Sequence, residues 1–201
     1  MQRMLHNRRM ARPKEHNPEF VLESAMKAFW ADGYEGTSIR DLAKACKLTT
    51  RSMYNAYPDK DSFFEAALEL YQQIVLNPLI QILELGHGFS AIKAFFEVLE
   101  KGSTADGCLF FNTSASRHLV RPLAAKKVDR YIYRLRETLI KKLEEERVAR
   151  KFSGNSELRA DQIVASIMGF VQSLKAGISN KRAGAVLRSE EHTSELQSHH
   201  P

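Results

Sequence analysis

The chain has 201 residues and carries 30 lysines and arginines against 24 aspartates and glutamates, which gives a formal net charge of +6 and a pI of about 9.3. Hydrophobic residues make up 43% and charged residues 27%, so the composition is that of a folded globular protein rather than of a disordered chain. The sequence has no run of about 18 apolar residues for a membrane span and no apolar segment behind its basic start for a secretory signal, so we expect a cytoplasmic protein without a membrane partner.

A basic arm is predicted at the start of the chain, over residues 1–14. Five basic side chains and no acidic one lie between residues 3 and 14. A flexible arm of this composition suits a polyanionic partner, although a solvated terminus has the same composition. A second basic stretch, residues 117–151, fits the exposed side of a long helix, because its charges are spread around the helix.

The first two helices are predicted from their caps. Asn17 followed by Pro18 is a typical helix start, since proline at the first helical position loses no hydrogen bond. Gly33 is expected to end this helix. Thr37 is then expected to cap a short helix over residues 38–46, with its apolar side chains on one side.

The next two helices follow without long loops. Thr49 is expected to cap a third helix over residues 50–57. Asp59 caps a fourth helix that begins at Lys60 and is strongly apolar on one side. Pro78 is expected to kink or break this fourth helix.

The remainder of the chain is also predicted to be helical, since no stretch alternates with a period of two. Ser90 is expected to cap a helix that ends near Glu100. Further segments with helical spacing, after loops at 102–107 and 153–155, lie at residues 108–116, 123–150, 158–176 and 180–187. The fold class predicted is therefore all-α.

Three short helices with a tight link between the second and the third predict a helix-turn-helix, whose third helix enters a DNA major groove about 12 Å wide. The outer face of residues 50–57 carries side chains that can bind base edges: Thr50, Arg51, Ser52, Tyr54 and Asn55. Tyr54, Tyr57 and Lys60 can reach phosphates, and Arg9 and Arg12 of the basic arm are further candidate DNA contacts. The alternative is a plain helical bundle with a polar surface.

The segments AFWADGYEGTSIRDLAKA and MYNAYPDK, with Phe63-Phe64 behind them, resemble the N-terminal domain of TetR/AcrR-type transcriptional regulators. The resemblance covers about residues 12–75, with GCLFFN as a weaker match beyond. It implies an N-terminal three-helix helix-turn-helix domain, a C-terminal helical bundle for ligand binding and dimerisation, and a homodimer on a palindromic operator in double-stranded DNA. It also implies that Thr37 touches a phosphate, that Thr49, Thr50, Arg51, Ser52, Tyr54 and Asn55 lie along the groove, and that Lys60 grips the backbone.

Three positions depart from the family pattern. Lys47 stands in the turn where the family usually has glycine, and a positive φ there would cost a lysine about 1 kcal/mol. Arg51 replaces a small residue, and Ala56 replaces a common histidine. Arg51 can therefore add a base contact or fold back onto a phosphate, and the operator sequence does not follow from relatives.

The C-terminal part is expected to enclose an effector pocket. The candidate lining residues are Phe95, Phe110, Phe111, Asn112, Tyr131, Met168, Phe170 and Gln172. An aromatic cavity with few polar groups would suit a hydrophobic effector, whereas the alternative for each residue is that it fills the core.

Cys108 is a candidate redox or electrophile sensor. It lies at a predicted loop-to-helix start, where a helix N-terminus lowers the pKa of a thiol. The alternative is an inert buried cysteine, as is common for this residue type and as we expect for Cys46.

Neither a catalytic nor a metal site is expected. The histidines and the two cysteines show no ligand spacing, and no nucleophilic triad or glycine-rich phosphate loop is present, so we predict no metal, no cofactor and no enzymatic activity.

We divide the chain into a basic arm (1–14), a helix-turn-helix domain (15–75), a ligand-binding and dimerisation domain (76–187) and a tail (188–201). The tail sequence RSEEHTSELQS resembles one reading frame of a DNA-sequencing adapter, so we predict it to be artefactual. The function predicted is a ligand-responsive repressor that a small hydrophobic or electrophilic effector releases from a palindromic operator. The alternatives are a ligand-independent or activating helix-turn-helix regulator, and a helical interaction module or enzyme without DNA binding.

Overall fold

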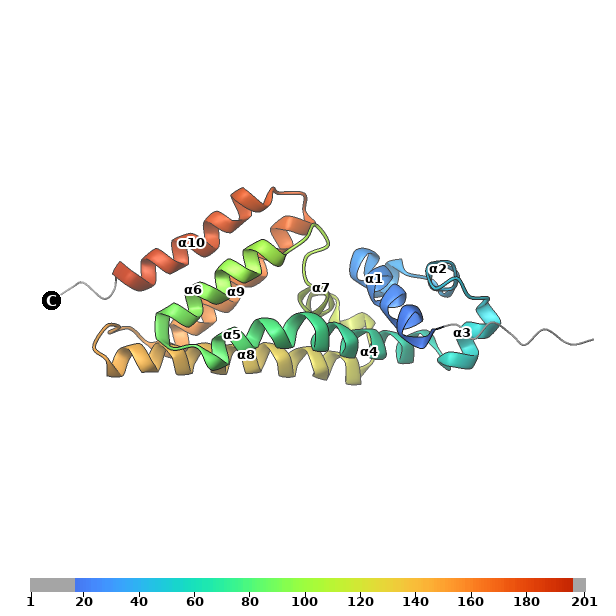
Figure 1. The fold of residues 1–201 in the computed structure, drawn as a ribbon, viewed down its shortest axis with the longest axis horizontal. Helices are drawn as coiled ribbons and strands as arrows, with labels where there is room; N and C mark the ends of the chain where they lie inside the picture. Colours follow the sequence, from blue (N-terminus) through green and yellow to red (C-terminus); the bar gives the residue numbers. More distant parts are fainter. Residues whose placement is uncertain (1–16, 197–201) are drawn as a thin grey trace, which may run out of the picture.

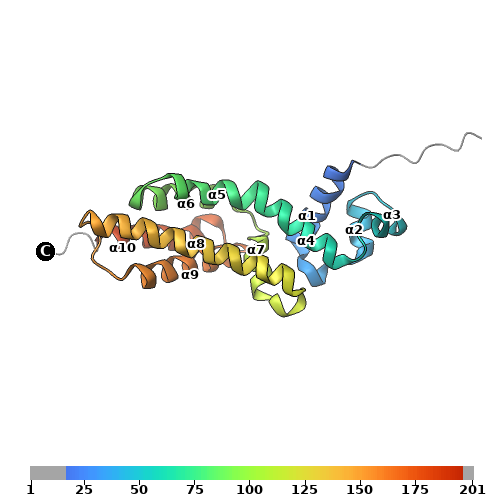
Figure 2. The same ribbon diagram turned by 90° about the horizontal axis from the view of Figure 1, so that it is seen from below.

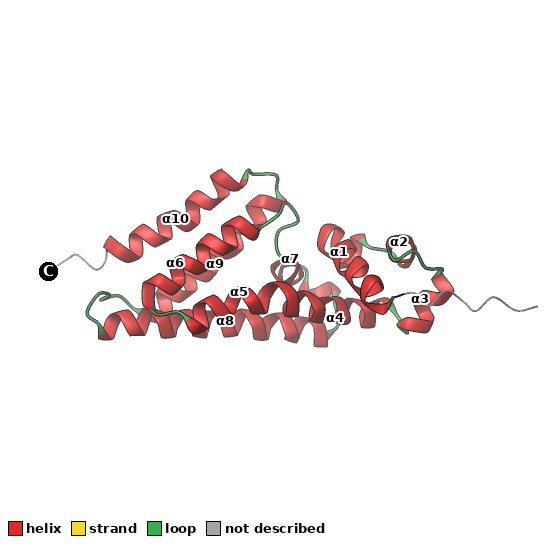
Figure 3. Ribbon diagram, viewed as in Figure 1, coloured by secondary structure: helices red, strands yellow, loops and turns green. Residues whose placement is uncertain are grey.

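The computed structural model describes residues 17–196 of the chain. Its regular structure within this range is helical, apart from an isolated bridge between Thr104 and Gly107 (Figure 3). The elements are α1 (Pro18–Gly36), α2 (Ile39–Ala45), α3 (Thr50–Ala56), α4 (Lys60–Tyr71), a π-helical segment η1 (Gln72–Leu76), α5 (Asn77–Leu85), α6 (Gly88–Gly102), α7 (Leu109–Ala115), a 3-10 turn η2 (Arg117–Leu119), α8 (Pro122–Val148), α9 (Ser156–Lys175) and α10 (Asn180–Leu196). The predicted all-α fold class is confirmed.

The molecule is elongated, with α2 and α3 at one end and α10 towards the other (Figures 1 and 2). Helices α4 and α5 form a nearly continuous rod beside the long helix α8, and α6 and α9 pack with α10 at the far end. Helix α4 contacts both α1 and α8, so it joins the N-terminal helices to the C-terminal bundle.

Aromatic side chains fill the core of the N-terminal part. Phe29 of α1 meets Phe64 of α4 edge-on, with ring centroids 4.9 Å apart, and Tyr34 lies edge-on to the same ring at 5.1 Å. Such edge-to-face pairs add to the free energy gained by burying the rings. They fix α1 against α4, while α2 packs on α1 and α3 packs on α2, with Leu42 and Met53 buried.

Most helix starts lie where the sequence predicts them. The side chain of Asn17 accepts a hydrogen bond from the backbone N–H of Glu19, that of Thr49 from Ser52, and that of Asp59 from Ser62. Each bond satisfies a backbone donor that has no partner within its helix. Gly33 adopts a φ of 75° and interrupts α1, as predicted, although helical hydrogen bonding resumes to Gly36.

The prediction that Thr37 caps α2 is wrong. The cap is Ser38, which forms a capping box with Asp41: each side chain accepts the backbone N–H of the other residue. Thr37 is instead fully buried, and its hydroxyl donates to the carbonyl oxygen of Gly33 at 2.7 Å. The glycine break leaves that carbonyl available, and Thr37 fills the corner between α1 and α2.

The chain remains helical where Pro78 was expected to kink or break it. A π-helical segment, η1, separates α4 from α5, and Pro78 lies in the first turn of α5. Single π turns accommodate an irregularity in the hydrogen-bond ladder, and the missing N–H of proline costs least at a helix start. The fourth predicted helix thus becomes two helices on nearly one axis.

The start of α6 also differs from the prediction, because Ser90 does not cap it. Two α8 carboxylates take that place: Glu145 accepts from the N–H of Gly88 at 2.7 Å, and Glu146 accepts from the N–H of Phe89 at 2.9 Å. Acidic groups at a helix N-terminus also interact favourably with the helix dipole. Buried Lys142 completes the cluster by donating to the carbonyl oxygen of Gly86.

The last helix, α10, continues to Leu196 rather than ending at Leu187. Residues 188–196 contain neither glycine nor proline, so no residue in them ends a helix that has already begun. No helix between residues 17 and 196 combines the length and the apolar character that a membrane crossing needs.

Candidate nucleic-acid interface and apolar cavity

Helix α3 lies at one end of the molecule (Figure 1). A row of its polar side chains is exposed to solvent. The exposed residues are Thr49, Thr50, Arg51, Tyr54 and Asn55, and Tyr54 has 52% of its surface exposed. Ser52 is half-buried, and its hydroxyl lies 2.9 Å from that of Thr49. Met53 points into the core and holds the helix in place. The face predicted to enter a groove is therefore free of packing contacts with the core.

Tyr57 and Lys60 lie beside this face and are more enclosed. The Tyr57 ring stacks on Phe63 with centroids 4.1 Å apart, and burial raises the pKa of its phenol. The Lys60 ammonium lies 4.2 Å above the ring of Tyr34, and burial lowers its pKa. A cation held over an aromatic face is positioned in advance for an anion, because its side chain has fewer conformations to lose.

The remaining predicted DNA contacts are Thr37 and two arginines of the basic arm. Thr37 has no exposed surface, so its side chain does not face a phosphate in this structure. The sequence analysis placed the cap of α2 one position too early. The residue that caps α2 is Ser38, which is exposed. Arg9 and Arg12 lie outside the described residues.

The turn between α2 and α3 has the backbone conformation that glycine favours. Lys47 adopts a φ of 55°, in the left-handed region, and its ammonium lies 5.6 Å from the ring centroid of Phe20. The strain expected for a lysine at this position is therefore present in the structure.

Replacement of this lysine by glycine should stabilise the protein. Lys47→Gly relieves left-handed strain of about 1 kcal/mol. It also removes a weak cation–π contact and adds conformational entropy to the unfolded chain, and both of these oppose the gain. We therefore expect the free energy of unfolding to rise by up to about 0.5 kcal/mol. Urea unfolding measures it. Lys44→Gly, inside α2, is the control and should lose about 1 kcal/mol. A loss at both positions would contradict the strain argument.

Arg121, which precedes α8, ties the start of α4 to the C-terminal bundle. Its guanidinium lies 2.9 Å from a carboxylate oxygen of Asp59 and 3.0 Å from one of Asp61. Asp61 also accepts a hydrogen bond from the hydroxyl of Tyr34, at 2.7 Å. Burial, together with this hydrogen bond, raises the pKa of Tyr34 to about 12. The end of α4 nearest to α3 is thus held by a charged network.

This charged network should make the free energy of unfolding depend on pH. Hydrogen bonds from the backbone and side chain of Ser62, with Arg121, lower the pKa of Asp59 to about 2. A lowered pKa stabilises the fold above the unfolded value of about 3.9, and this stabilisation is lost as the pH falls towards the folded value. The unfolding free energy of wild type should therefore fall towards that of Asp59→Asn between about pH 6 and about pH 2.

Asparagine is the matched replacement because it also caps helices but does not titrate in this range. Exposed Asp32→Asn serves as the control and should not change the pH profile relative to wild type in this way. Urea unfolding at several pH values measures all three proteins. A constant difference between wild type and Asp59→Asn would show that the lowered pKa does not contribute.

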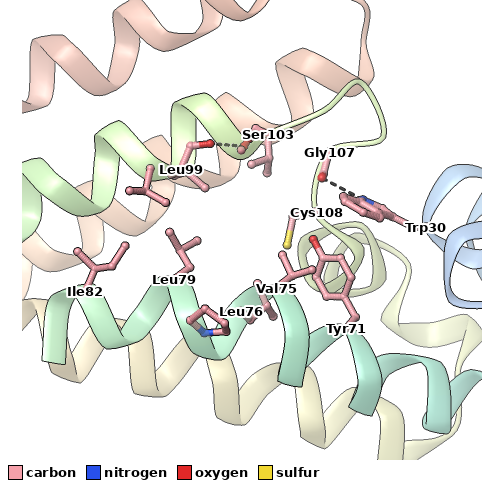
Figure 4. Close-up of a pocket in the computed structure, with 14 residues that line it drawn as sticks. Trp30, Tyr71, Val75, Leu76, Leu79, Ile82, Leu99, Ser103, Gly107 and Cys108 are labelled. Carbon is pink, nitrogen blue, oxygen red and sulfur yellow. Dashed lines mark hydrogen bonds between the residues drawn. The ribbon is translucent and has the colours of Figure 1, made fainter. Parts of the chain in front are cut away.

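A cavity of about 280 Å³ lies where the N-terminal helices meet the C-terminal bundle (Figure 4). Its walls come from α1, α4, η1, α5, α6, α9 and the loop before α7. The lining residues are Trp30, Tyr71, Val75, Leu76, Pro78, Leu79, Ile82, Val98, Leu99, Gly102, Ser103, Gly107, Cys108 and Val171. The cavity is almost entirely apolar, which is typical of small-molecule sites.

The residues predicted to line a pocket do not line this one. The aromatic members of that set, Phe95, Phe110, Phe111, Tyr131 and Phe170, are buried and fill the core. Met168 packs against the core from its edge. Asn112 donates to the carbonyl oxygen of Asp106 and accepts from Gln172, so both amides hold the α6–α7 loop. The predicted residues and the walls of this cavity therefore do not coincide.

Cys108 lines the cavity, but its thiol does not have the lowered pKa that was predicted. Burial raises the pKa, and this outweighs the hydrogen bonds from the N–H groups of Phe110 and Phe111 and from Tyr71. The helix N-terminus therefore acts as expected, but loss of hydration is the larger effect. Cys46 is also buried, its thiol lies 3.3 Å from the carbonyl oxygen of Val21, and burial raises its pKa to about 11.

No cluster of histidine, cysteine, aspartate and glutamate that could hold a metal ion occurs within the described part of the chain.

Comparisons with known proteins agree with the helix-turn-helix. Residues 21–67 match the model of the tetR family of bacterial regulatory proteins. The HTH-type transcriptional repressor ComR of Escherichia coli (strain K12) is 38% identical over 60 residues, which are 30% of this chain and 29% of ComR. The uncharacterized HTH-type transcriptional regulator YezE of Bacillus subtilis (strain 168) is 29% identical over 126 residues, 60% of this chain and 65% of YezE. The matches thus span less than two thirds of either relative.

The fold comparison covers more of the chain. A cysteine mutant of the TetR family transcriptional regulator CifR, solved with a 26-bp double-strand operator DNA, superposes with a TM-score of 0.75 and 18% identity. The superposition covers 90% of this chain and 98% of that one, so the C-terminal bundle shares the fold as well. Residues 21–67 thus match the tetR family of bacterial regulatory proteins, and the described part of the chain as a whole shares the fold of a TetR family regulator.

Proposed function

We propose that the protein is a transcriptional repressor that acts in the cytoplasm, binds a palindromic operator as a homodimer and is released by a small hydrophobic effector. The observation that carries the proposal is the exposed polar face of α3, held outward by buried Met53. The operator DNA in the CifR structure is a property of that protein, and it is consistent with this proposal.

The exposed polar side chains of α3 can each bind a group that double-stranded DNA offers. Arg51 can donate two hydrogen bonds to guanine, Asn55 can pair with adenine, and Thr50 can touch a thymine methyl group. Tyr54 can donate to a phosphate, as can the backbone N–H groups at the start of α3. Lys60 adds a charge that does not depend on base sequence.

A homodimer is supported by the exposed face of α9. Leu158 has 59% of its surface exposed, and Ala165, at the middle of the helix, and Gly169, about one turn further on, are also exposed. Small residues allow a second helix to approach closely. In the proposed dimer, two α3 helices lie about 34–36 Å apart and engage adjacent major grooves, and an effector that changes this spacing prevents both half-sites from binding together.

The cavity supports the effector part of the proposal. Tyr71, Val75 and Leu76 line it from α4 and η1, which lead directly to Lys60 at the proposed DNA surface. A molecule that fills the cavity and displaces this wall would move α4. Because binding energies of two ligands are linked, an effector that favours the displaced state lowers DNA affinity by the same factor as DNA lowers effector affinity.

Selection of bound fragments from a random pool of DNA duplexes tests the function. We expect an inverted repeat whose binding weakens steeply as salt rises, since several phosphate contacts release counterions. Binding that no effector alters would instead favour a ligand-independent regulator, and a reporter gene behind the selected site separates repression from activation. No salt-dependent binding at all would reject DNA recognition and favour a helical interaction module.

A further inference from the structure

One wall of the cavity belongs to the N-terminal helices themselves. Trp30, on α1, lines the cavity together with Tyr71 of α4 and with Gly107 and Cys108 of the loop before α7 (Figure 4). The indole lies edge-on to the Tyr71 ring, with centroids 5.0 Å apart. A molecule in the cavity would therefore contact α1 directly, as well as α4.

A single hydrogen bond joins α1 to the loop at this point. The indole N–H of Trp30 donates to the carbonyl oxygen of Gly107 at 3.0 Å. Gly107 is closely packed on its other side, where an added Cβ would lie 3.0 Å from the carbonyl oxygen of Val171, and it has a φ of +70°. The acceptor is thus held rigidly between α1 and α9.

Trp30 and Gly107 both line the cavity, so a bound molecule can compete for the hydrogen bond between them. An indole has one N–H and no acceptor, so it can serve Gly107 or a bound molecule, but not both well. A ligand that carries a hydrogen-bond acceptor at this end competes with Gly107 for Trp30. A ligand of the same shape without an acceptor leaves the bond in place.

The cavity walls also restrict the charge of the ligand. The lining contains no aspartate, glutamate, lysine, arginine or histidine. An ion buried there would lose its hydration without a partner, which is far more costly than burying a neutral group. The volume of about 280 Å³ lies just below the range of about 300–1,000 Å³ for drug-sized ligands, so a compound of one or two rings fits.

We infer that the effector is a small neutral ring compound with a carbonyl-type acceptor, and that it signals by taking the indole N–H of Trp30 away from Gly107. The Trp30–Gly107 bond belongs to the DNA-binding state, and its loss frees α1 from the α6–α7 loop. The inference rests on the proposed function and adds to it the class of effector and the contact through which it acts.

Three naphthalenes of similar shape test the class of ligand. We expect 2-acetylnaphthalene and 2-ethylnaphthalene both to bind the DNA-free protein, with a change in the fluorescence of Trp30, the single tryptophan of the chain. The anion 2-naphthoate should bind at least tenfold more weakly. Failure of both neutral probes to bind, or equal binding of the anion, would overturn the inference whatever the protein does with DNA.

The effect on DNA separates the hydrogen bond from simple filling. On the selected operator, 2-acetylnaphthalene should lower DNA affinity by about 2–10-fold, the range expected for one hydrogen bond, whereas 2-ethylnaphthalene should not. An equal response to both probes overturns the role of the bond. If the protein binds no DNA before a probe is added, the proposed function itself fails and the inference with it.

Because the chain has one tryptophan, growth of a tryptophan auxotroph on an isosteric benzothiophene analogue replaces Trp30 alone. The analogue keeps the ring contacts but has no N–H. We expect DNA affinity without a probe to fall about 2–10-fold, and the difference between the two neutral probes to disappear. The control Val98→Ala alters the wall at another point, so it should weaken both probes alike and keep that difference. An analogue protein that still responds to the acetyl probe alone would refute the assignment.

Discussion

Gly88→Ala is expected to lower the free energy of unfolding by about 2–4 kcal/mol, the largest effect of a single methyl group that we expect in this structure. Gly88 has a φ of +50°, which costs an alanine about 1 kcal/mol, and an added Cβ would lie 1.7 Å from a carboxylate oxygen of Glu146. That oxygen accepts the N–H of Phe89, so the carboxylate cannot move without breaking a bond to a charged group, worth about 1.5–3 kcal/mol.

Urea unfolding measures this loss, and the other end of the same helix provides the control. Gly102 has a negative φ and open space around its Cβ position, so Gly102→Ala should be neutral or slightly stabilising. The double variant Gly88→Ala with Glu146→Ala removes the clash, and it should lose less than the sum of the two single variants. Additive losses would show that the carboxylate does not cause the effect.

Features that depend on neighbouring residues were predictable from the sequence. The caps at Asn17, Thr49 and Asp59 each need only a side chain and a backbone N–H two or three residues away, and the structure has all three. The positive φ of Lys47 was expected from the family resemblance, which has glycine at this turn. The exposed face of α3 also followed, because helical spacing fixes which side chains lie opposite Met53.

Features that depend on distant residues were not predictable. Thr37 and Ser38 are both good caps; the capping-box spacing of Ser38 and Asp41 was a local signal for Ser38, whereas the burial of Thr37 in the corner at the Gly33 break was not. The start of α6 is capped by carboxylates 57 residues away, so no local signal marks it. For the same reason the sequence did not distinguish residues that line the cavity from residues that fill the core. Phe95 and Phe110 have the helical spacing expected of both kinds, and only their neighbours in the folded structure show that they belong to the core.

Two opposing effects act on the pKa of the Cys108 thiol, and the sequence shows only one of them. Its backbone hydrogen bonds at the start of α7 lower the pKa, as the sequence suggests, but its burial raises the pKa by more. Burial is a property of the assembled bundle, where Tyr71 and the α6–α7 loop enclose the sulfur. Trp30 is a similar case, since nothing in its own segment indicates that it reaches Gly107, 77 residues away.

Arg51→Ala is expected to weaken binding to the selected operator by about 1–3 kcal/mol and to relax specificity at one base pair, because a bidentate arginine distinguishes guanine from other bases. Lys60→Ala should weaken binding alike on all sequences and reduce the salt dependence by about one phosphate contact. Arg51 lies on the exposed face of α3 and half-buried Lys60 lies at the start of α4, and both carry a positive charge, so the dependence on DNA sequence is what separates their roles.

A panel of operators with single base changes, measured in binding titrations at two salt concentrations, gives both quantities for each variant. Lys101→Ala, on α6 at a distance from α3, serves as the control and should change neither. Thermal unfolding checks the fold, since Lys60→Ala also removes the contact with the Tyr34 ring, worth about 0.5–1 kcal/mol. Equal losses for Arg51→Ala on every operator would mean that its guanidinium binds a phosphate, and that base recognition rests on Thr50 and Asn55.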